Sequence, residues 1–242
     1  MLAHRRRSTR AACKRALDLA GASALLVCLS PVLLVCGGLV RLVDGPPVLF
    51  RQERVGRRGR TFQLYKLRTM RPQAGGPLVT AAGDPRLTRL GRWLRSRKLD
   101  ELPQLVNVLR GDMSLVGPRP EVPLYVGRQP HGFRAIADLR PGLTDWASLA
   151  FLDEEGVLAA HGGEPDFYPD VLLPRKLALA RLYRRRQTLS LDLRIVVATA
   201  AAAAGWRSMA VRLAGPRLVA RARRGLGLSQ AAEQVGPKQR EG

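Results

Sequence analysis

Two adjacent carboxylates, Asp100 and Glu101, are the residues whose types and spacing most clearly suggest chemistry. They lie in segment 98–104 (KLDELPQ), between a strongly basic stretch and an apolar one, in a chain of net charge +22. Asp100 could cap a helix that starts at Glu101, with Pro103 in its first turn. A carboxylate held at a helix N-terminus beside arginines is also well placed to meet a phosphate, and the two interpretations are compatible.

The charge balance limits the classes of partner. Lys and Arg total 41 against 19 acidic residues, which predicts anionic partners such as nucleic acid, phospholipid headgroups or phosphorylated substrates. Arginine suits bidentate contact with phosphate oxygens. The three cysteines, Cys13, Cys28 and Cys36, form no CxxC pair, which argues against a disulfide scaffold or a zinc site and fits a reducing, cytoplasmic setting.

The N-terminal region predicts a membrane element. Residues 1–15 are basic and residues 19–40 carry no charge; a helix of that apolar length spans about 33 Å, enough for a bilayer core of about 30 Å. Ser30-Pro31 near its middle predicts a kink. Both flanks are rich in Arg and Lys, which favours the cytoplasmic side for both ends. We therefore expect a re-entrant membrane helix over 16–44, broken at Ser30 and Pro31; a straight span is the alternative.

The elements around the two carboxylates follow from periodicity. Segments 48–52 and 61–69 predict short strands joined by a basic turn, with Lys66 and Arg68 together on the polar side. Segment 85–99 predicts a basic amphipathic helix bearing Trp93, either an interfacial helix on anionic lipid or a solvated face over a core helix. A helix over 102–109 should stop near Gly111.

The remaining chain supplies stiff turns and further helices. Pro-Arg-Pro at 118–120 should present Arg119 in a fixed direction, and Arg140 lies in a second stiff turn. Residues 151–170 form the acidic region, and residues 174–204 predict helix. The expected fold is α+β and mostly helical, with interfacial amphipathic helices and a small globular domain with short strands over 45–204. A basic, partly disordered extension follows over 205–242.

Four segments together resemble the bacterial sugar transferase family, the monotopic polyprenyl-phosphate phosphoglycosyl transferases. They are PVLFRQERVG at 47–56, YKLRTM at 65–70, LDELPQLVNVLRGDMSLVGPRP at 99–120 and RPGLT at 140–144. The resemblance runs from about residue 14 to about residue 200, and the 99–120 block is long and distinctive. Many family members have Gly where this chain has Asp145, and the acidic insert at 151–170 also differs from the smallest members.

The resemblance implies a reaction and its residues. Asp100 would attack the β-phosphate of a nucleotide-sugar, release the nucleoside monophosphate and hold the phosphosugar until polyprenyl phosphate accepts it. Magnesium is the implied metal, at Asp100 and Glu101; Glu101 positions the metal or assists the acceptor. Arg95 and Arg119 match the family's arginines. We expect Arg95, Arg119 and Arg140 to bind phosphate, with Lys66 and Arg68 as weaker candidates that could instead meet lipid headgroups or solvent.

The predicted function is therefore initiation of exopolysaccharide or glycoconjugate assembly on the cytoplasmic face of the bacterial inner membrane. The expected partners are a nucleotide-sugar carrying uridine, polyprenyl (undecaprenyl) phosphate and anionic phospholipid. The alternative is a non-catalytic basic protein that binds the membrane surface. A nucleic-acid binder is disfavoured, because neither adjacent carboxylates nor the apolar run at 19–40 would serve it.

Overall fold

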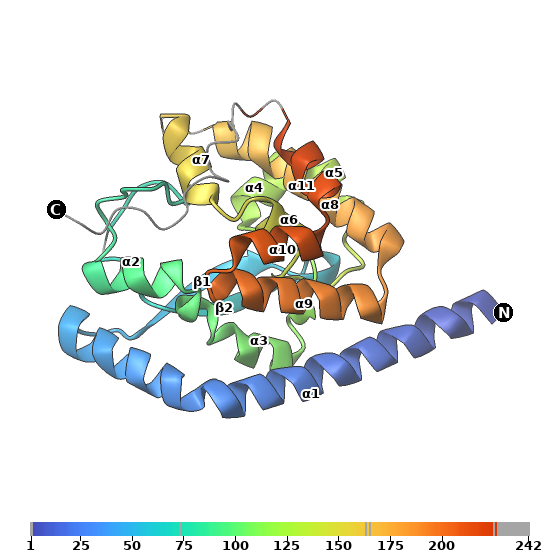
Figure 1. The fold of residues 1–242 in the computed structure, drawn as a ribbon, viewed down its shortest axis with the longest axis horizontal. Helices are drawn as coiled ribbons and strands as arrows, with labels where there is room; N and C mark the ends of the chain where they lie inside the picture. The colour runs from blue at the N-terminus through green and yellow to red at the C-terminus, as the bar shows by residue number, and fades with distance from the viewer. Residues whose placement is uncertain (1, 73, 163, 165, 225, 227–242) are drawn as a thin grey trace.

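The computed structural model describes residues 2–72, 74–162, 164, 166–224 and 226. The chain is mostly helical with a few short strands, as the α+β prediction requires. A long apolar helix lies along one side, and the other elements form a layer of strands and helices above it (Figure 1). The first half contains α1 (Leu2–Leu39), η1 (Val40–Asp44), β1 (Leu49–Val55), η2 (Arg57–Gly59), β2 (Thr61–Leu67), α2 (Arg89–Ser96), η3 (Leu99–Glu101), α3 (Gln104–Arg110) and β3 (Ser114–Val116). The second half contains α4 (Pro123–Arg128), α5 (Pro130–Arg134), β4 (Gly142–Thr144), α6 (Trp146–Ala150), α7 (Glu154–Ala160), η4 (Phe167–Leu172), α8 (Leu173–Arg186), α9 (Leu189–Ala203), α10 (Arg207–Ala214) and α11 (Pro216–Arg223).

Helix α1 continues through the Ser30-Pro31 step, so no interruption of the helix occurs there. Pro31 has no N–H for the carbonyl of Val27, and the Ser30 hydroxyl donates to that carbonyl instead, at 2.8 Å. The axis of α1 curves along its length (Figure 1). By length and composition the helix 10–44 could cross a membrane, and little of its most apolar window is buried in the protein.

The polar start of α1 is fastened to the globular layer. The Arg15 guanidinium donates to two carbonyls in the last turn of α3, at 2.7 and 3.1 Å. The buried Asp18 carboxylate accepts from the Ser114 hydroxyl at 2.8 Å and the Leu115 N–H at 3.1 Å, and it pairs with Lys14 at 3.7 Å. These contacts hold the start of the apolar segment against α3 and β3.

Two small sheets position the segments that carry arginines. Strands β1 and β2 form the expected antiparallel hairpin, with Leu49 opposite Leu67 and Val55 opposite Thr61. Strands β3 and β4 pair in parallel, and their backbones approach so closely that a Cβ on Gly117 would lie 2.3 Å from the Arg140 carbonyl oxygen. Only glycine fits there, and the contact fixes the turns around Arg119 and Arg140 relative to each other.

The main core lies among the C-terminal helices. Trp146, Leu149, Leu172, Leu177 and Tyr183 are buried there, at the junction of α6, η4 and α8. The predicted helix over 174–204 is two helices, because α8 ends at Arg186 and Thr188 caps α9. Within the extension predicted at 205–242, α10 and α11 pack on α6 and α9; residues 227–242 lie outside the described part of the chain.

Candidate active site

The two carboxylates lie in η3, a single 3₁₀ turn between α2 and α3. Lys98 precedes this turn in the left-handed conformation, with φ of 58°, and it reverses the chain after α2. Asp100 and Glu101 are 3% and 9% exposed, so both are nearly buried. The predicted capping role of Asp100 is wrong: α3 begins at Gln104 after Pro103 and has no side-chain cap. Asp100 is therefore inside a tight turn rather than at a helix N-terminus.

Glu101 is held by two cations. Lys66 at the end of β2 donates to Glu101 Oε1 at 2.9 Å. Arg119 donates to the same oxygen and, at 3.4 Å, to Oε2. Burial alone would raise the pKa of Glu101, but the charges of Arg119 and Lys66 hold it well below its usual range. Glu101 is thus ionised, and its carboxylate oxygens are occupied by hydrogen bonds from Lys66 and Arg119.

The Asp100 carboxylate accepts no hydrogen bond from the described residues. Burial raises its pKa, and the neighbouring charge of Glu101 acts in the same direction, while Lys66 and Arg95 oppose the shift. A carboxylate that is nearly buried and lacks hydrogen-bond donors is poorly solvated. Its oxygens therefore remain available to an electrophile or a cation.

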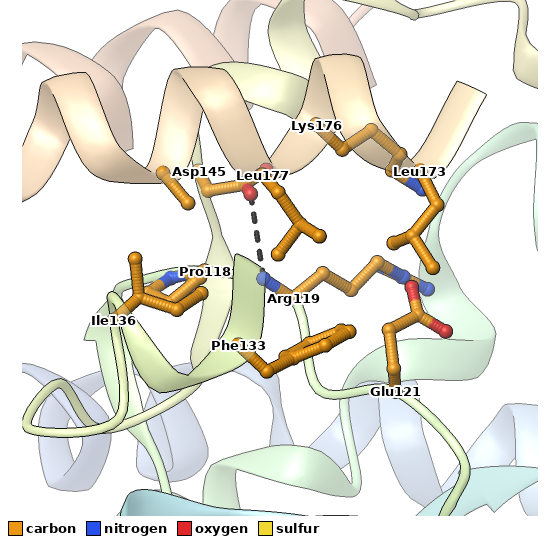
Figure 2. Close-up of a pocket in the computed structure, with 10 residues that line it drawn as sticks. Pro118, Arg119, Glu121, Phe133, Ile136, Asp145, Leu173, Lys176 and Leu177 are labelled. Atoms are coloured by element: carbon orange, nitrogen blue, oxygen red, sulfur yellow. Dashed lines mark hydrogen bonds between the residues drawn. The ribbon is translucent and has the colours of Figure 1, made fainter. Parts of the chain in front are cut away.

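Arg119 reaches Glu101 because both its backbone and its side chain are fixed. Its N–H donates to Asp145 Oδ2 at 3.3 Å (Figure 2), and the other oxygen of Asp145 caps α6 by accepting from the Ser148 N–H at 2.7 Å. The Arg119 side chain extends between Phe133 and α8 beside a cavity of about 20 Å³ (Figure 2). Asp145, which departs from the family motif, is therefore a positioning residue.

Arg95 lies on α2, close enough for its charge to act on Asp100. Its guanidinium is paired with Glu155 of α7 through two hydrogen bonds, the longer of them 2.9 Å. The acidic insert therefore contacts the candidate site directly. Sequence reasoning noted the insert as a departure from the family but assigned no role to Glu155.

Arg68 and Arg140 make their contacts elsewhere. Arg68 donates at 2.6 to 2.7 Å to the carbonyls of Asp44, Gly45 and Pro46, so it ties β2 to the end of the N-terminal helix. Arg140 donates to the Gly111 carbonyl at 3.1 Å, beyond the end of α3. Lys66 and Arg68 were predicted to lie together on the polar side of the strand, but their contacts diverge, because Arg68 is buried against the end of the N-terminal helix and Lys66 contacts Glu101.

A second polar network lies beside Arg119. Lys176 pairs with Glu154 at 2.9 Å, and the Tyr168 hydroxyl donates to Glu121 at 2.5 Å. Arg54 pairs with Glu121 at 3.4 Å. These residues are far apart in sequence and share no motif, so no local signal in the sequence predicted the network. The network supports the segment that carries Arg119.

The donor set for a metal is small. Among the described residues no three His, Cys, Asp or Glu side chains gather as a metal site. Asp100 and Glu101 are two adjacent carboxylates, and Mg²⁺ in proteins commonly uses one or two carboxylates and completes its shell with water and substrate phosphate. The hard oxygen donors present fit Mg²⁺ in that mode, with Asp100 as the carboxylate not already hydrogen-bonded.

Comparison with known proteins identifies the class. The family model for bacterial sugar transferases matches residues 9–205, so this chain belongs to the bacterial sugar transferase family, as its motifs predicted. It is 48% identical over 142 residues to a UDP-glucose:undecaprenyl-phosphate glucose-1-phosphate transferase of Caulobacter vibrioides, covering 56% of this chain and 53% of the relative. It is 36% identical over 195 residues to an undecaprenyl-phosphate glucose phosphotransferase of Komagataeibacter xylinus, covering 77% and 35%.

A third relative is named for a different sugar from the first two. The chain is 39% identical over 143 residues to a UDP-N-acetylgalactosamine-undecaprenyl-phosphate N-acetylgalactosaminephosphotransferase of Aeromonas hydrophila, covering 56% of this chain and 33% of that protein. The chain therefore spans about half the length of the Caulobacter relative and about a third of the other two.

Proposed function

We propose that this protein transfers a phosphosugar from a nucleotide-diphosphate-sugar to polyprenyl phosphate, with Asp100 as a covalent nucleophile. The observation that carries the proposal is the difference in contacts between the two adjacent carboxylates, Asp100 and Glu101, which we call the dyad. Glu101 accepts hydrogen bonds from Lys66 and Arg119, while the Asp100 carboxylate accepts none from the residues that the structure describes and lies beside the cations Lys66 and Arg95. The names of the relatives support this reaction class.

The first step exchanges one phosphate bond for another. An Asp100 carboxylate oxygen bonds to the β-phosphorus of the nucleotide-sugar, and the bond from that phosphorus to the bridging oxygen breaks. The bridging oxygen and its electron pair leave with the nucleoside monophosphate. Asp100 then carries the phosphosugar as an acyl phosphate. Burial raises the pKa of Asp100, while the charges of Lys66 and Arg95 oppose that shift. A carboxylate attacks in its ionised form, so the step needs no general base to remove a proton from it.

The second step restores the enzyme. A phosphate oxygen of polyprenyl phosphate bonds to the same phosphorus, and the bond to the Asp100 oxygen breaks. The products are the free carboxylate and a polyprenyl diphosphate sugar. Two displacements at one phosphorus divide a difficult transfer between two anions into two easier ones.

The surrounding cations would stabilise the negative charge that develops on the oxygens of the transferred phosphoryl group in the transition state. Lys66 and Arg119 lie within hydrogen-bond reach of Glu101, next to Asp100, and Arg95 is close by. Preorganised charges of this kind are usually the largest contribution to phosphoryl-transfer catalysis. Mg²⁺ held by Asp100 and Glu101 would supply further charge neutralisation of the diphosphate.

We propose that α1 acts as a re-entrant membrane helix at the cytoplasmic face of the inner membrane. Both ends of its apolar segment have basic flanks, and exposed apolar side chains such as Val27, Leu34 and Val35 cover it. Anionic phospholipid would meet the basic flanks. Tags at both termini of the full chain should be labelled only from the cytoplasm; an N-terminal tag labelled from the far side would show a straight span.

The names of the relatives support a class of donor and a class of acceptor for the proposed reaction. Those proteins are named for UDP-sugars and undecaprenyl phosphate, and we propose the same donor and acceptor classes here. The relatives differ in sugar, glucose in one case and N-acetylgalactosamine in another. A panel of UDP-sugars with undecaprenyl phosphate and Mg²⁺, scored by release of UMP, would identify the sugar.

Asp100→Asn tests the covalent step. The amide is a far weaker nucleophile, so we expect UMP release to fall by about a thousand-fold or more while membrane association persists. Asp170→Asn, on an exposed carboxylate of η4, is the matched control and should keep full activity. Radiolabelled sugar should remain on the denatured wild-type chain and not on Asp100→Asn. Full turnover by Asp100→Asn would disprove the mechanism, and an inactive wild type that still binds vesicles would favour the membrane-binding alternative.

A further inference from the structure

A second basic concavity lies apart from the dyad. It is a cleft of about 320 Å³ between the η2 turn, the end of α3 and the turn before β4. We call it the arginine cleft, and its charged lining residues are Arg57, Arg58, Arg60, Arg110, Asp112 and Arg140.

The arginine cleft and the dyad lie at opposite ends of the same two elements. Strand β2 begins at Thr61, which lines the cleft, and Lys66 near its other end contacts Glu101. Five residues of strand separate these points by about 17 Å. Helix α3 likewise begins just after the dyad and ends with Arg110 in the cleft. The cleft is therefore a separate site.

The cleft adjoins the polar start of the membrane helix. Arg15 donates to two carbonyls in the last turn of α3, and its guanidinium lies close to Gly111 on the cleft wall. The apolar segment of α1 begins only four residues later, at Leu19. If α1 enters a bilayer, the cleft lies near the level of the lipid headgroups.

Arginines outnumber acids in the lining of the cleft, where Asp112 is the one acidic residue among those the structure describes. Among the described residues, none of its five arginines forms an ion pair with a carboxylate, whereas Arg54, Arg86, Arg95 and Arg119 each do. The nearest acids have other partners: Asp138 pairs with Arg184 at 2.8 Å, and Asp112 accepts from the Asn107 amide at 3.3 Å.

Neutral groups orient the arginines instead. Arg57 donates to the Asp138 carbonyl at 2.8 Å, Arg140 to the Gly111 carbonyl, and Arg110 to the Tyr65 hydroxyl at 2.7 Å. Burial and the like charges of Arg140 and Arg58 lower the pKa of Arg57. The cations are thus held close together against their mutual repulsion, which a bound anion would relieve.

The backbone of the η2 turn is constrained in the same region. Arg58 has a left-handed conformation, with φ of 57°, and its N–H donates to the Ala137 carbonyl at 2.7 Å. A non-glycine residue adopts this conformation at a cost that the surroundings must offset, and such positions gather at functional sites. The constrained turn places the consecutive residues Arg57 and Arg58 in the lining of the arginine cleft.

We propose that the arginine cleft is a second phosphate-binding site. Arginine guanidinium groups match phosphate oxygens in bidentate geometry, and the cleft has room for a phosphate with part of its attached group. The phosphate belongs either to a membrane lipid or to a soluble phosphate ester. The site does not depend on the proposed reaction, because binding is measured without turnover.

The test compares full-length wild type with Arg58→Gln/Arg60→Gln. Both side chains are exposed and make no hydrogen bond among the described residues, so the fold should persist, and thermal unfolding checks this. Arg185→Gln/Arg186→Gln at the exposed end of α8 removes the same charge far along the chain and is the matched control. A single variant, Arg57→Gln, probes the partly buried member.

Two arms distinguish the source of the phosphate. One measures binding of pyrophosphate to protein in neutral detergent with EDTA; the other measures partition to phosphatidylcholine vesicles with and without phosphatidic acid. We expect the cleft variants to bind about ten-fold more weakly in at least one arm, and the control to match wild type. Loss only with vesicles identifies a lipid phosphate, and loss only with pyrophosphate a soluble one. Unchanged binding in both arms, or equal loss in the control, overturns the proposal.

Discussion

Glu155 of α7 holds the guanidinium of Arg95, the arginine of α2 that lies nearest in sequence before the dyad. In the proposed reaction, a donor phosphate and the Glu155 carboxylate compete for the same cation. Both side chains are partly exposed, 24% for Arg95 and 39% for Glu155, so solvent weakens the pair and a substrate can displace it.

Glu155→Gln should therefore improve donor binding. Removing the carboxylate frees Arg95, and we expect the KM for the nucleotide-sugar to fall about two- to five-fold with little change in kcat. Steady-state UMP release measures both constants. Glu164→Gln, an exposed acid in the same insert, is the control. An unchanged KM in Glu155→Gln would mean that Arg95 does not contact the donor.

Replacing each carboxylate of the dyad by its neutral amide should change the stability of the protein in opposite directions. Glu101→Gln leaves the Lys66 and Arg119 charges without their carboxylate, and we expect a loss of about 2–3 kcal/mol in the free energy of unfolding. Asp100→Asn removes a nearly buried carboxylate that accepts no hydrogen bond within the described part of the chain, so stability should stay equal or rise. Thermal unfolding in a mild detergent compares the two, and equal destabilisation would contradict this assignment.

Asp145 should matter through Arg119 rather than through the substrate. Asp145→Ala removes the cap of α6 and the acceptor for the Arg119 N–H, and we expect a loss of about 1–2 kcal/mol in stability with a lower kcat. Asp145→Asn retains a capping oxygen and should recover most of both. If Asp145→Asn were as inactive as Asp145→Ala, Asp145 would act by its charge and not by position.

The loop before α2 should make the protein acid-sensitive. Hydrogen bonds from Arg86 lower the pKa of Asp84 in the folded state, with the shortest at 2.6 Å. A lowered folded pKa means that the stabilisation is complete above the unfolded value of about 3.9 and is lost as pH falls through the folded value. Asp84→Asn should lose about 1 kcal/mol near pH 6, and its difference from wild type should shrink below about pH 4. A constant difference across this range would refute the linkage.

Local signals predicted much of the fold. Period-two alternation located the β1–β2 hairpin, and Gly111, with φ of 91°, ends α3 where a C-terminal glycine was expected. The carboxylate pair and Arg119 were identified by type, spacing and family motif. These features depend on residues close together in sequence.

The contacts that complete the site are long-range and escaped prediction. Glu101 meets Lys66 across 35 residues, and Arg95 meets Glu155 across 60. Arg68 appeared to belong to a polar face, but its guanidinium satisfies three backbone carbonyls at the end of the N-terminal helix. No periodicity encodes such pairings, because they depend on how separate elements pack.

The glycine contact between β3 and β4 joins the turn that carries Arg119 to the turn that carries Arg140. Gly117 and Gly142 bring two main chains together without side chains between them, and the Gly142 N–H donates to the Pro118 carbonyl at 2.9 Å. Arg119 leaves this junction toward the dyad, and Arg140 leaves it toward the arginine cleft. A side chain introduced at either glycine would collide with the opposite main chain, so we expect such a substitution to displace both arginine-bearing turns at once.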